Sequence, residues 1–488
     1  MGTDHLLSLF KEITRIPRES GHEEQIIAYL QKFAEDRNLE CKTDEAGNVL
    51  IIKEATPGKE NTPTIILQSH SDMVCEKNSG VEHDFAKDPI KYVIEDGWMI
   101  AKDTTLGADC GIGMAAQLAL LEDENLEHGK IEALFTTAEE TGLDGAKALK
   151  PGFLSGDILI NLDSEDEGEL FIGCAGGLDT TAEFHYTPKK LASHKVSAKF
   201  GYCGGLGGHS GDDIDKGRAN AVQILGRFLY RAYEECGIEL CTIDGGNKRN
   251  AIAREAYAVI AFNSSDEDRV VELFNETLEA VRNEYSLTDP NLQGIAEPIK
   301  WEGDVIDSKT VKNLIYSLNF APHGVLAMSA SMKGMVETST NLASVKVLDN
   351  NIIRVGTSQR SSNNYAKSFA GQRVEAAFKA VGAEVSHNSE YPGWQPRLDS
   401  KILETSVAAY KKLFNVDPIV RSIHAGLECG LFLDIYPNLD MISFGPTIRG
   451  VHAPGERLDL VSLDKFWLLL QEIIKSITVK ENEEEVDI

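Results

Sequence analysis

Histidine, aspartate and glutamate residues recur along this chain, most of them where strand-like apolar runs give way to turns or polar loops. The set consists of His70, Asp72, Asp109, Glu139, Glu140, Asp163 and His452. Imidazole and carboxylate groups without cysteine thiolates are typical ligands of Zn²⁺, Mn²⁺ or Co²⁺ in hydrolytic sites, whereas structural zinc sites are rich in cysteine. The residue types therefore favour a catalytic metal centre, provided that the fold brings them together.

His70 and Asp72 follow the apolar run 64–67 and are two residues apart. In an extended backbone, residues at this spacing point to the same side. Asp72 can therefore accept a hydrogen bond from the ring nitrogen of His70 that faces away from a metal, or from a loop neighbour. Such a carboxylate fixes the tautomer of a ligating imidazole and raises its basicity. His-x-Asp is common in proteins, so this pair alone does not identify a ligand.

The remaining carboxylates each have a structural and a metal-binding interpretation. Asp109 lies in a glycine-rich turn before a predicted helix, where it caps the helix or bridges two cations with its two oxygens. Glu139 and Glu140 end a strand-like run, and adjacent carboxylates repel unless a cation is near. If one of them binds a metal, the other can act as general base towards a metal-activated water. Asp163 follows an apolar strand, where a charge needs a partner.

The elements predicted before residue 188 alternate between helix and strand. Residues 20–23, Ser-Gly-His-Glu, match a capping box before a helix with apolar residues at helical spacing. Strands are predicted at 49–52, 65–67, 131–136 and 158–162, and a helix at 111–121. This order predicts an α/β fold with a mostly parallel or mixed sheet flanked by helices. Ligands of such sheets bind beyond the carboxyl ends of the strands, where His70, Glu139, Glu140 and Asp163 are expected.

A second domain is predicted at residues 188–391. Its first part has a strand at 195–200, a glycine-rich loop at 204–211 that contains His209, and a helix at 219–236. A looser echo of this order follows later, with a strand at 351–357, Arg360 in a turn and a helix at 368–381. The echo is weak, and the sequence leaves an internal duplication open. We expect this α+β domain to be inserted into a catalytic domain formed by residues 1–187 and 392–488, because His452 must reach the N-terminal ligands.

Composition narrows the class of protein. The chain has 488 residues, which exceeds what one hydrophobic core usually supports. Its net charge of −29 argues against nucleic acid or an anionic membrane as a partner. No apolar run approaches the roughly 20 residues of a spanning helix, and no signal peptide is visible, so a cytoplasmic protein is expected. Eight scattered cysteines predict buried thiols and no disulfide framework, and the acidic run 481–487 predicts a solvated tail.

The combined motifs resemble the M20 metallopeptidase family, and within it the branch of dipeptidases that act on Xaa-His substrates. The resembling stretches are residues 69–77, 104–109, 139–142, 161–165, 173–177, 207–211, 423–430 and 445–449. They are spread over essentially the whole chain, and their combination is highly specific. One departure is visible, since Cys110 stands where such dipeptidases often carry asparagine after the bridging aspartate. It removes no ligand.

The resemblance implies a zinc-peptidase-like fold whose inserted domain serves as a lid and for dimerisation. It also implies two zinc ions per subunit, with Co²⁺ or Mn²⁺ as possible substitutes. One zinc would be held by His70 and Asp163 and the other by Glu140 and His452, with Asp109 bridging. Asp72 would support His70, and Glu139 would be the catalytic base. An aspartate at position 163, where carboxypeptidase relatives carry glutamate, fits the dipeptidase branch.

The resemblance further implies that residues of the inserted domain bind the substrate. His209 would stabilise the tetrahedral oxyanion. Arg360 would bind the C-terminal carboxylate, assisted by Asn250 and by backbone near Gly426. A homodimer is expected, and the sequence leaves open whether His209 serves its own subunit or its partner.

Other functions remain open at this point. The same scaffold serves N-acyl amino acid deacylases and other aminopeptidases. Activity on dipeptides with a free amine, but not on N-acetylated ones, would distinguish a dipeptidase from a deacylase. A catalytically silent binding protein on the same fold is a third possibility, although such a protein has no use for a general base. Neither the exact dipeptide preference nor the native metal can be obtained from the sequence.

Overall fold

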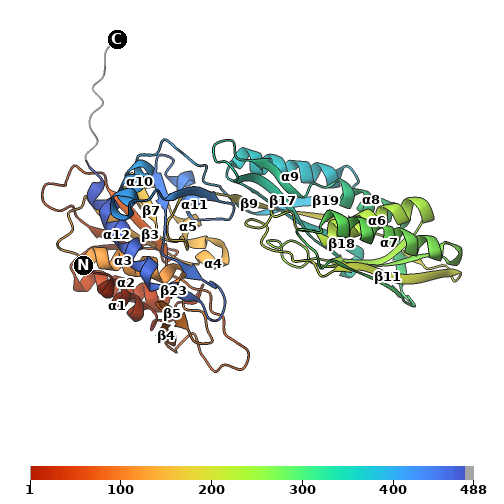
Figure 1. The fold of residues 1–488 in the computed structure, drawn as a ribbon, viewed down its shortest axis with the longest axis horizontal. Coiled ribbons are helices and arrows are strands. Elements are labelled where there is room, and N and C mark those ends of the chain that lie inside the picture. Colours follow the sequence, from red (N-terminus) through yellow and green to blue (C-terminus); the bar gives the residue numbers. More distant parts are fainter. Residues whose placement is uncertain (1, 479–488) are drawn as a thin grey trace, which may run out of the picture. The chain divides into compact units, whose positions relative to one another are not determined.

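The computed structural model describes residues 2–478, so the predicted acidic tail at 481–487 lies outside the described residues. The chain divides into two compact units (Figure 1). Unit 1 comprises Met1–Gly173, Pro396–Ser422 and Glu428–Ile488, and unit 2 comprises Cys174–Gln395 and Ile423–Leu427. Unit 1 is therefore assembled from three separate stretches of the chain.

A mixed eight-stranded sheet forms the centre of unit 1, in the order β1-β2-β6-β3-β7-β21-β8-β20. Its strands are β1 (Glu40–Thr43), β2 (Val49–Lys53), β3 (Ile65–His70), β6 (Ile131–Thr136), β7 (Ile158–Asn161), β8 (Glu169–Cys174), β20 (Ile419–Ile423) and β21 (Asp440–Ser443). Neighbours β6, β3, β7 and β21 run parallel, and β1, β2 and β8 add antiparallel pairs. All residues of β3 and β6 are buried, as expected for strands covered on both faces. The predicted mixed sheet flanked by helices is confirmed.

Helices surround this sheet. They are α1 (Thr3–Ile13), α2 (Glu24–Asp36), α3 (Ala108–Glu122), α4 (Glu139–Gly142), α5 (Asp144–Ala148), α10 (Lys401–Phe414), α11 (Cys429–Ile435) and α12 (Leu460–Ser476). Helix α3 packs on β3, α10 packs on β21, and α2 packs on β1 and β2. Nearly all of α3 is buried, because it is rich in glycine, alanine and leucine. A small sheet in the order β22-β23-β5-β4 completes the unit, with β4 (Tyr92–Glu95), β5 (Trp98–Ala101), β22 (Ile448–Arg449) and β23 (Arg457–Asp459).

The capping box predicted at residues 20–23 is wrong. Helix α2 begins at Glu24, and no side chain caps its first turn. The Ser20 hydroxyl instead donates a hydrogen bond to Oδ2 of Asp72 at 2.7 Å. Glu23 accepts one from the backbone amide of Ala138 at 2.9 Å. Both side chains therefore hold distant loops of unit 1, which local spacing could not indicate.

Unit 2 contains a nine-stranded sheet, in the order β14-β11-β13-β12-β17-β18-β9-β19 with β16 paired to β17. Its strands are β9 (Gly176–His185), β11 (Lys195–Cys203), β12 (Glu239–Gly245), β13 (Ala256–Asn263), β14 (Gln293–Pro298), β16 (Gly324–Met328), β17 (Val336–Leu348), β18 (Ile352–Ser361) and β19 (Glu384–Tyr391). The helices are α6 (Ala221–Cys236), α7 (Glu267–Glu284), α8 (Ser308–Phe320) and α9 (Asn364–Lys379), with short 3₁₀ turns η1 (Ser264–Asp266) and η2 (Asp349–Asn351). Strands β10 (Pro188–Lys190) and β15 (Asp304–Ile306) form a separate pair.

The sheet of unit 2 consists of two halves with the same β-α-β-β-α-β topology. One half is β11-α6-β12-β13-α7-β14, and the other is β9-α8-β17-β18-α9-β19. From the outer edge inwards, the strands of one half lie in the order β14-β11-β13-β12, and those of the other in the equivalent order β19-β9-β18-β17. The two inner strands, β12 and β17, are the second strand of each half and pair antiparallel. The first half is inserted between β9 and α8 of the other. The topology is therefore repeated, which the sequence left open.

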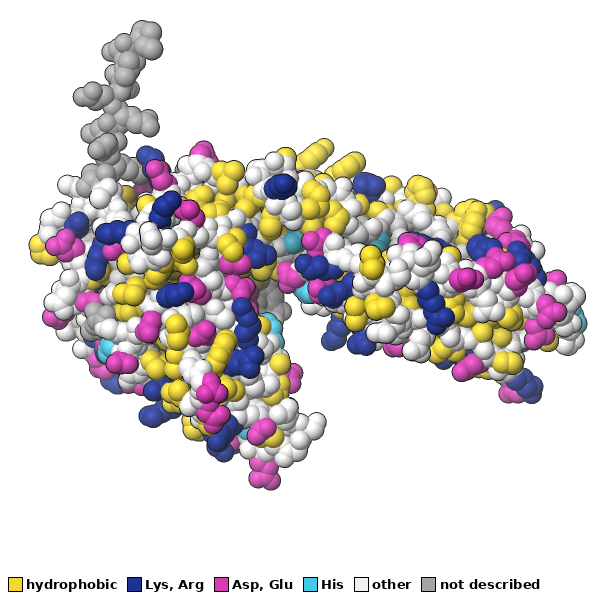
Figure 2. All heavy atoms as spheres, viewed as in Figure 1, with side chains coloured by type: hydrophobic (Ala, Val, Ile, Leu, Met, Phe, Trp, Pro, Cys, Tyr) yellow, Lys and Arg dark blue, Asp and Glu magenta, His cyan; other side chains and the backbone are white. Residues whose placement is uncertain are grey.

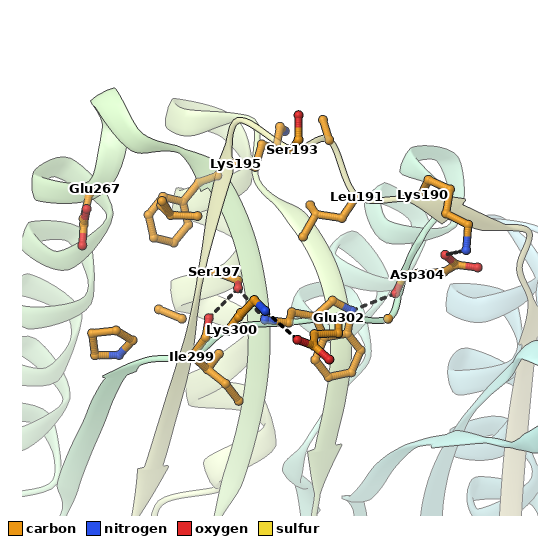
Figure 3. Close-up of a pocket in the computed structure, with 17 residues that line it drawn as sticks. Lys190, Leu191, Ser193, Lys195, Ser197, Glu267, Ile299, Lys300, Glu302 and Asp304 are labelled. Atoms are coloured by element: carbon orange, nitrogen blue, oxygen red, sulfur yellow. Dashed lines mark hydrogen bonds and ion pairs between the residues drawn. The ribbon is translucent and has the colours of Figure 1, made fainter.

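One continuous apolar core lies between this sheet and its helices, with Phe200, Phe228 and Phe274 in mutual ring contact. Alternate residues of β12 and β13, among them Cys241 and Val259, face the other side. A surface cavity of about 670 Å³ opens on this unit, beside β10, β11 and β15 (Figure 3). Its lining lysines Lys190 and Lys300 are paired with Asp304 and Glu302 at 2.6 and 2.7 Å. None of the predicted site residues lines this cavity.

Acidic and basic side chains are interspersed over the surface in view, without one continuous acidic region (Figure 2). Many of them form exposed ion pairs, such as Arg269 with Glu235 and Arg227 with Glu284. Exposed pairs of this kind contribute little to stability. Among residues 2–478, no helix combines the length and the apolar character that crossing a membrane would require.

Candidate metal centre and active site

Three adjacent parallel strands of unit 1 deliver side chains to one edge of the sheet. His70 is the last residue of β3, Glu139 and Glu140 open α4 shortly after β6, and Asp163 lies two residues beyond β7. Because β6, β3 and β7 are neighbours and run parallel, their carboxyl ends lie side by side. The crevice expected from the predicted strand order is therefore formed by these residues.

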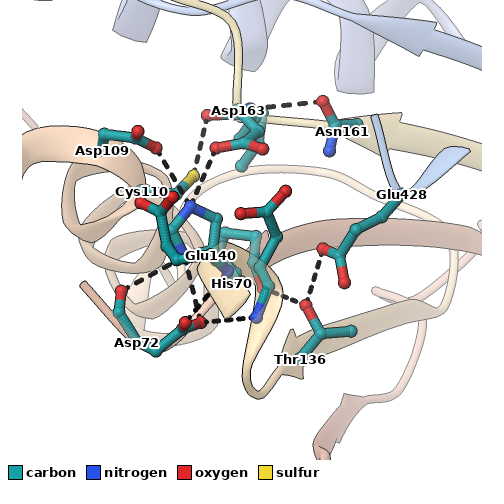
Figure 4. A network of polar contacts seen from close by, with 12 residues as sticks. His70, Asp72, Asp109, Cys110, Thr136, Glu140, Asn161, Asp163 and Glu428 are labelled. Atoms are coloured by element: carbon teal, nitrogen blue, oxygen red, sulfur yellow. Dashed lines mark hydrogen bonds and ion pairs between the residues drawn. The ribbon is translucent and has the colours of Figure 1, made fainter. Parts of the chain in front are cut away.

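Two histidines from opposite ends of the chain complete the cluster. Nε2 of His70 lies 3.0 Å from Oδ1 of Asp109 and 3.3 Å from Oδ1 of Asp163 (Figure 4). Nε2 of His452, in the loop between β22 and β23, lies 3.1 Å from Oδ2 of Asp109 and 3.0 Å from Oε2 of Glu140. The five predicted ligands thus converge, and Asp109 directs one oxygen to each histidine.

The position of Asp109 depends on an irregular start of α3. Asp109 and Cys110 have non-helical dihedral angles inside the assigned helix, and Gly107 before them has a φ of 69°. A left-handed residue of this kind is favourable only for glycine. The turn therefore places the Asp109 carboxylate beside the crevice, whereas a regular first turn would continue along the helix axis.

The arrangement fits divalent cations. Each histidine Nε2 faces two carboxylates, although one ring nitrogen can donate only one hydrogen bond well. Oε1 of Glu140 and Oδ1 of Asp163 are buried and accept no hydrogen bond from the described residues. Hydrogen bonds to Asp109 and Glu140 raise the pKa of His452 to about 11. Imidazole nitrogens and free carboxylate oxygens that converge in this way are a suitable donor set for zinc-like ions.

Asp72 supports His70 from behind. Its Oδ1 lies 3.3 Å from Nδ1 of His70, and its two oxygens accept hydrogen bonds from the backbone amides of Glu139 and Glu140 at 3.1 and 3.2 Å. Burial raises the pKa of Asp72, but the hydrogen bonds from His70 and Ser20 and the charge of His70 outweigh it and lower the pKa to about 2. Asp72 therefore stays ionised and fixes both the histidine ring and the start of α4.

Glu139 lies beside the cluster, and its side chain makes no hydrogen bond or ion pair with the predicted ligands among the described residues. Burial raises its pKa well above the usual value, and the charges of Asp163, Glu140 and Glu428 act in the same direction against that of His70. Glu428 is itself buried, and burial raises its pKa to about 8. Its Oε2 accepts hydrogen bonds from Gln68 and Thr136 at 2.6 and 2.7 Å (Figure 4). A carboxylate in such surroundings has a raised proton affinity, as a general base requires.

Cys110 lies close enough to be a further group in this cluster. Its thiol could contribute a ligand atom together with His70 and Asp163. The thiol donates a hydrogen bond to the carbonyl oxygen of Leu162 at 3.2 Å, however, and burial with the nearby charge of Asp163 raises its pKa well above the usual value. The geometry favours a protonated thiol that tethers the Asp109 turn to the strand end at Leu162.

The three predicted substrate-binding residues and His209 lie together in unit 2. Nδ1 of His209 accepts hydrogen bonds from the backbone amides of Gly211 and Asp212, both at 3.3 Å. Nδ1 also lies 3.3 Å from Oδ2 of Asp212, so Nε2 is the ring nitrogen that makes no hydrogen bond to the described residues. The backbone oxygen of Asn250 accepts from the amide of Ser210 at 2.9 Å, whereas the Asn250 side chain is exposed.

Arg360, on β18, is 7% exposed. Its Nε donates to Oγ of Ser210 at 3.3 Å, and its Nη1 donates to the Tyr391 hydroxyl at 3.2 Å. The Tyr391 ring lies over Gly426, where an added Cβ would come within 3.0 Å of the ring. A side chain at position 426 would therefore press on the Tyr391 ring, a constraint that the sequence did not reveal. Nearby, Nε2 of His424 lies 2.7 Å from Oγ of Ser339, and burial lowers the His424 pKa to about 3.

Several residues of these sites had no signal in the sequence that connected them with the predicted ligands. Arg18, Ser20, Glu23 and Glu456 are buried or partly buried polar groups that hold the ligand-bearing loops of unit 1. Tyr391 likewise contacts Arg360 from a distant strand. Their partners lie far away in the chain, so no local spacing could have identified them.

Comparison with known proteins agrees with this geometry. The family profile described as "Peptidase family M20/M25/M40" matches residues 66–476. The chain is 41% identical over 475 residues to the cytosol non-specific dipeptidase of Escherichia coli (strain K12), covering 97% of this chain and 98% of that protein. A solved structure of aminoacylhistidine dipeptidase from Vibrio alginolyticus has a TM-score of 0.91 at 39% identity and covers 98% of this chain and 97% of its own.

A more distant structure supports the fold alone. The aminopeptidase PepT from Bacillus cereus matches with a TM-score of 0.57 at 18% identity, over 98% of this chain and 99% of its own. The family profile extends over most of the chain, and the Escherichia coli relative is similar along almost its whole length. The chain therefore belongs to peptidase family M20/M25/M40 and is a metallopeptidase, a hydrolase of peptide bonds.

Proposed function

We propose that this protein is a dipeptidase that hydrolyses dipeptides with a free amino terminus, Xaa-His dipeptides included. The observation that carries the proposal is the Asp109 carboxylate, which directs one oxygen towards each of two histidines. This geometry suits a pair of cations. The names of the Escherichia coli and Vibrio relatives, a non-specific dipeptidase and an aminoacylhistidine dipeptidase, support the substrate class.

The expected metal is zinc, two ions per subunit, with Co²⁺ or Mn²⁺ as substitutes. His70 and Asp163 would hold one ion, Glu140 and His452 the other, and Asp109 would bridge them. Two such ions, when bound, lower the pKa of a water molecule towards neutrality and polarise the scissile carbonyl group. The buried free oxygens of Glu140 and Asp163 support this division of ligands.

The residues around the ligands would move and hold protons. Glu139 would accept the proton of the attacking water and return it to the leaving amine, for which its raised proton affinity is suited. Asp72 would keep the His70 ring oriented through Nδ1, so that Nε2 presents its lone pair to the cation. Because Asp72 also accepts the amides of Glu139 and Glu140, one carboxylate would align both a ligand and the base.

Residues of unit 2 would bind the remainder of the substrate. His209 would donate from Nε2 to the developing oxyanion, because its Nδ1 already accepts two backbone amides. Arg360 would bind the C-terminal carboxylate with the part of its guanidinium that Ser210 and Tyr391 leave free, assisted by Asn250 and the backbone at Gly426. A cytoplasmic homodimer completes the proposal, in keeping with the cytosolic Escherichia coli relative.

A substrate panel on a sample of known metal content tests the proposal. The panel contains free dipeptides such as Ala-His and Gly-Leu, the same dipeptides with an acetylated amine, tripeptides, and N-acetyl amino acids. We expect hydrolysis of the free dipeptides and about two equivalents of metal per chain. Preferred cleavage of N-acetyl amino acids would overturn the dipeptidase assignment in favour of a deacylase.

Replacing Arg360 by Lys should impair binding of the dipeptide carboxylate. A lysine cannot present the planar fork that binds a carboxylate with two hydrogen bonds. We expect kcat/KM for dipeptides to fall by about 10²-fold, mainly through KM, since breaking one side of a buried charged pair costs about 2–5 kcal/mol. The measurement is steady-state kinetics with dipeptides and with their C-terminal amides, whose hydrolysis should change much less.

Arg354→Lys provides the matched control for Arg360. Arg354 lies on the same strand, but it is exposed and pairs with Glu183 at 2.7 Å. Its replacement should leave both kinetic constants near those of the wild type. An equal loss for dipeptides and their amides in Arg360→Lys would contradict the carboxylate role.

A further inference from the structure

A buried glutamate behind Asp109 has no role in the chemistry proposed so far. Glu456 is 2% exposed. Its Oε2 accepts hydrogen bonds from the backbone amides of Leu106 and Gly107 at 2.8 and 3.0 Å, and its Oε1 accepts from those of Ala108 and Asp109 at 2.7 and 3.4 Å. One carboxylate therefore holds four consecutive amides, which the irregular start of α3 leaves without helical partners.

A buried arginine holds the same turn through its carbonyl groups. Arg18 is 1% exposed, and its Nη2 donates to the carbonyl oxygen of Gly107. Its Nη1 donates to the carbonyl oxygens of Ser71 and Asp72 at 3.2 and 2.6 Å. Arg18 therefore links the turn that carries Asp109 to the loop after His70. Glycine at 107 is also required because an added Cβ would collide with this guanidinium.

Glu456 also connects the Asp109 turn to a second ligand. It lies four residues after His452, and its backbone is fixed by hydrogen bonds to Ala453 at 3.2 Å and from Ala101 at 3.0 Å. The loop that provides His452 therefore also provides the group that holds the Asp109 turn. Residues 452–456 thus link the positions of His452 and Asp109, because Glu456 at the end of this segment is buried and hydrogen-bonded to the Asp109 turn.

We propose that Glu456 and Arg18 are positioning residues that fix Asp109 between the two cation positions, so that cation affinity depends on them while the proton transfer by Glu139 does not. The proposal rests on the proposed metal centre. Neither residue is among the proposed ligands or substrate-binding residues, and the hydrogen bonds given above join both to backbone groups. Their effect is to hold the Asp109 carboxylate in the orientation in which each oxygen faces a different histidine.

A glutamine at position 456 should test this role with little change of shape. An amide has one acceptor oxygen in place of two, and its NH₂ group would face amides that also donate. The turn would lose two of its four hydrogen bonds, and Asp109 would become less well ordered. Removal of a group that orients a metal ligand typically weakens metal affinity by about 10–100-fold.

The experiment is a titration of chelator-treated full-length protein with Co²⁺, followed by the visible absorption of the bound ion. We expect Glu456→Gln to weaken Co²⁺ binding 10–100-fold, within the range above. At saturating Co²⁺, kcat should stay within about threefold of the wild type, because Glu139 and its surroundings are unchanged. Glu456→Asp keeps a carboxylate on a shorter side chain, so its Co²⁺ affinity should lie between those of the wild type and Glu456→Gln. This variant replaces Glu456→Gln in the test if the glutamine variant does not fold.

Glu132→Gln is a matched control. Glu132 is also a buried glutamate of unit 1, 1% exposed, and it accepts the backbone amides of Ser155 and Gly156 at 2.9 and 3.1 Å. It has no contact with a ligand-bearing turn. We expect its replacement to lower the thermal unfolding temperature without changing the Co²⁺ affinity.

The outcomes separate this inference from the proposed function. Wild-type Co²⁺ affinity in Glu456→Gln and Glu456→Asp, or equal weakening in Glu132→Gln, would overturn the positioning role. If the wild-type protein binds two Co²⁺ ions, and Glu456→Gln binds them weakly, but no dipeptide is hydrolysed, the positioning role stands and the proposed function fails.

Discussion

Replacement of Glu139 by glutamine should reduce kcat for dipeptides by about 10³-fold, within the range of general acid–base catalysis. The amide cannot accept a proton from water or deliver one to the leaving amine. It keeps the size of the side chain and leaves the backbone hydrogen bond to Asp72 in place. Metal content and thermal stability should therefore stay at wild-type values. The measurements are steady-state kinetics, elemental analysis and thermal unfolding of one preparation.

Glu124→Gln controls for a general effect of removing a negative charge from unit 1. Glu124 is exposed, in the connection after α3, and its replacement should leave kcat unchanged. A wild-type rate in Glu139→Gln would remove Glu139 from the role of base. A loss of metal from the same variant would instead identify Glu139 as a ligand.

Removal of divalent cations should abolish turnover and destabilise unit 1. Without cations, the carboxylates of Asp109, Glu140 and Asp163 share the same two histidines, and Oε1 of Glu140 and Oδ1 of Asp163 are buried without a hydrogen-bond donor among the described residues. A cation that binds only the native state stabilises it by about 2.7 kcal/mol at a concentration 100 times its dissociation constant. We expect chelator-treated protein to be inactive and to unfold at a lower temperature, and added Zn²⁺, Co²⁺ or Mn²⁺ to reverse both effects.

Asp109→Asn is the variant that makes this test specific. An asparagine can offer one oxygen but not a negative charge shared by two cations. The unfolding temperature of the Asp109→Asn variant should therefore rise much less on addition of Zn²⁺ than that of the wild type. If elemental analysis shows that the metal has been removed and the protein is still fully active, the proposed function is contradicted.

The arrangement of the first ligands could be predicted from the sequence for a physical reason. Apolar runs before His70, Glu139 and Asp163 marked buried strands, and the carboxyl ends of neighbouring parallel strands lie at one edge of a sheet. The structure confirms the mixed sheet, with β6, β3 and β7 adjacent. Asp109 was expected in a turn before a helix, and it lies there, although the first turn of α3 is irregular.

Other features could not be predicted, because they depend on contacts between distant residues. His452 lies in a loop of the small sheet, and only the family resemblance indicated its place. Ser20 and Glu23 have the spacing of a capping box, but their hydrogen bonds go to Asp72 and Ala138. Strand β9 precedes the predicted domain boundary at 188, yet it pairs with β18 and β19 inside the sheet of unit 2. That pairing is non-local, so alternating residues could not reveal it.

The division of unit 1 into three stretches has a consequence for biosynthesis. Residues 174–395 of unit 2 leave the ribosome as one stretch, and domains generally fold as units during synthesis. His452 and Glu456 are made only after that stretch and after much of the polypeptide that follows it. A nascent chain that has not reached residue 452 therefore lacks both a proposed ligand and the proposed anchor of the Asp109 turn. Binding of both cations at the proposed centre should accordingly follow synthesis of the chain beyond residue 456.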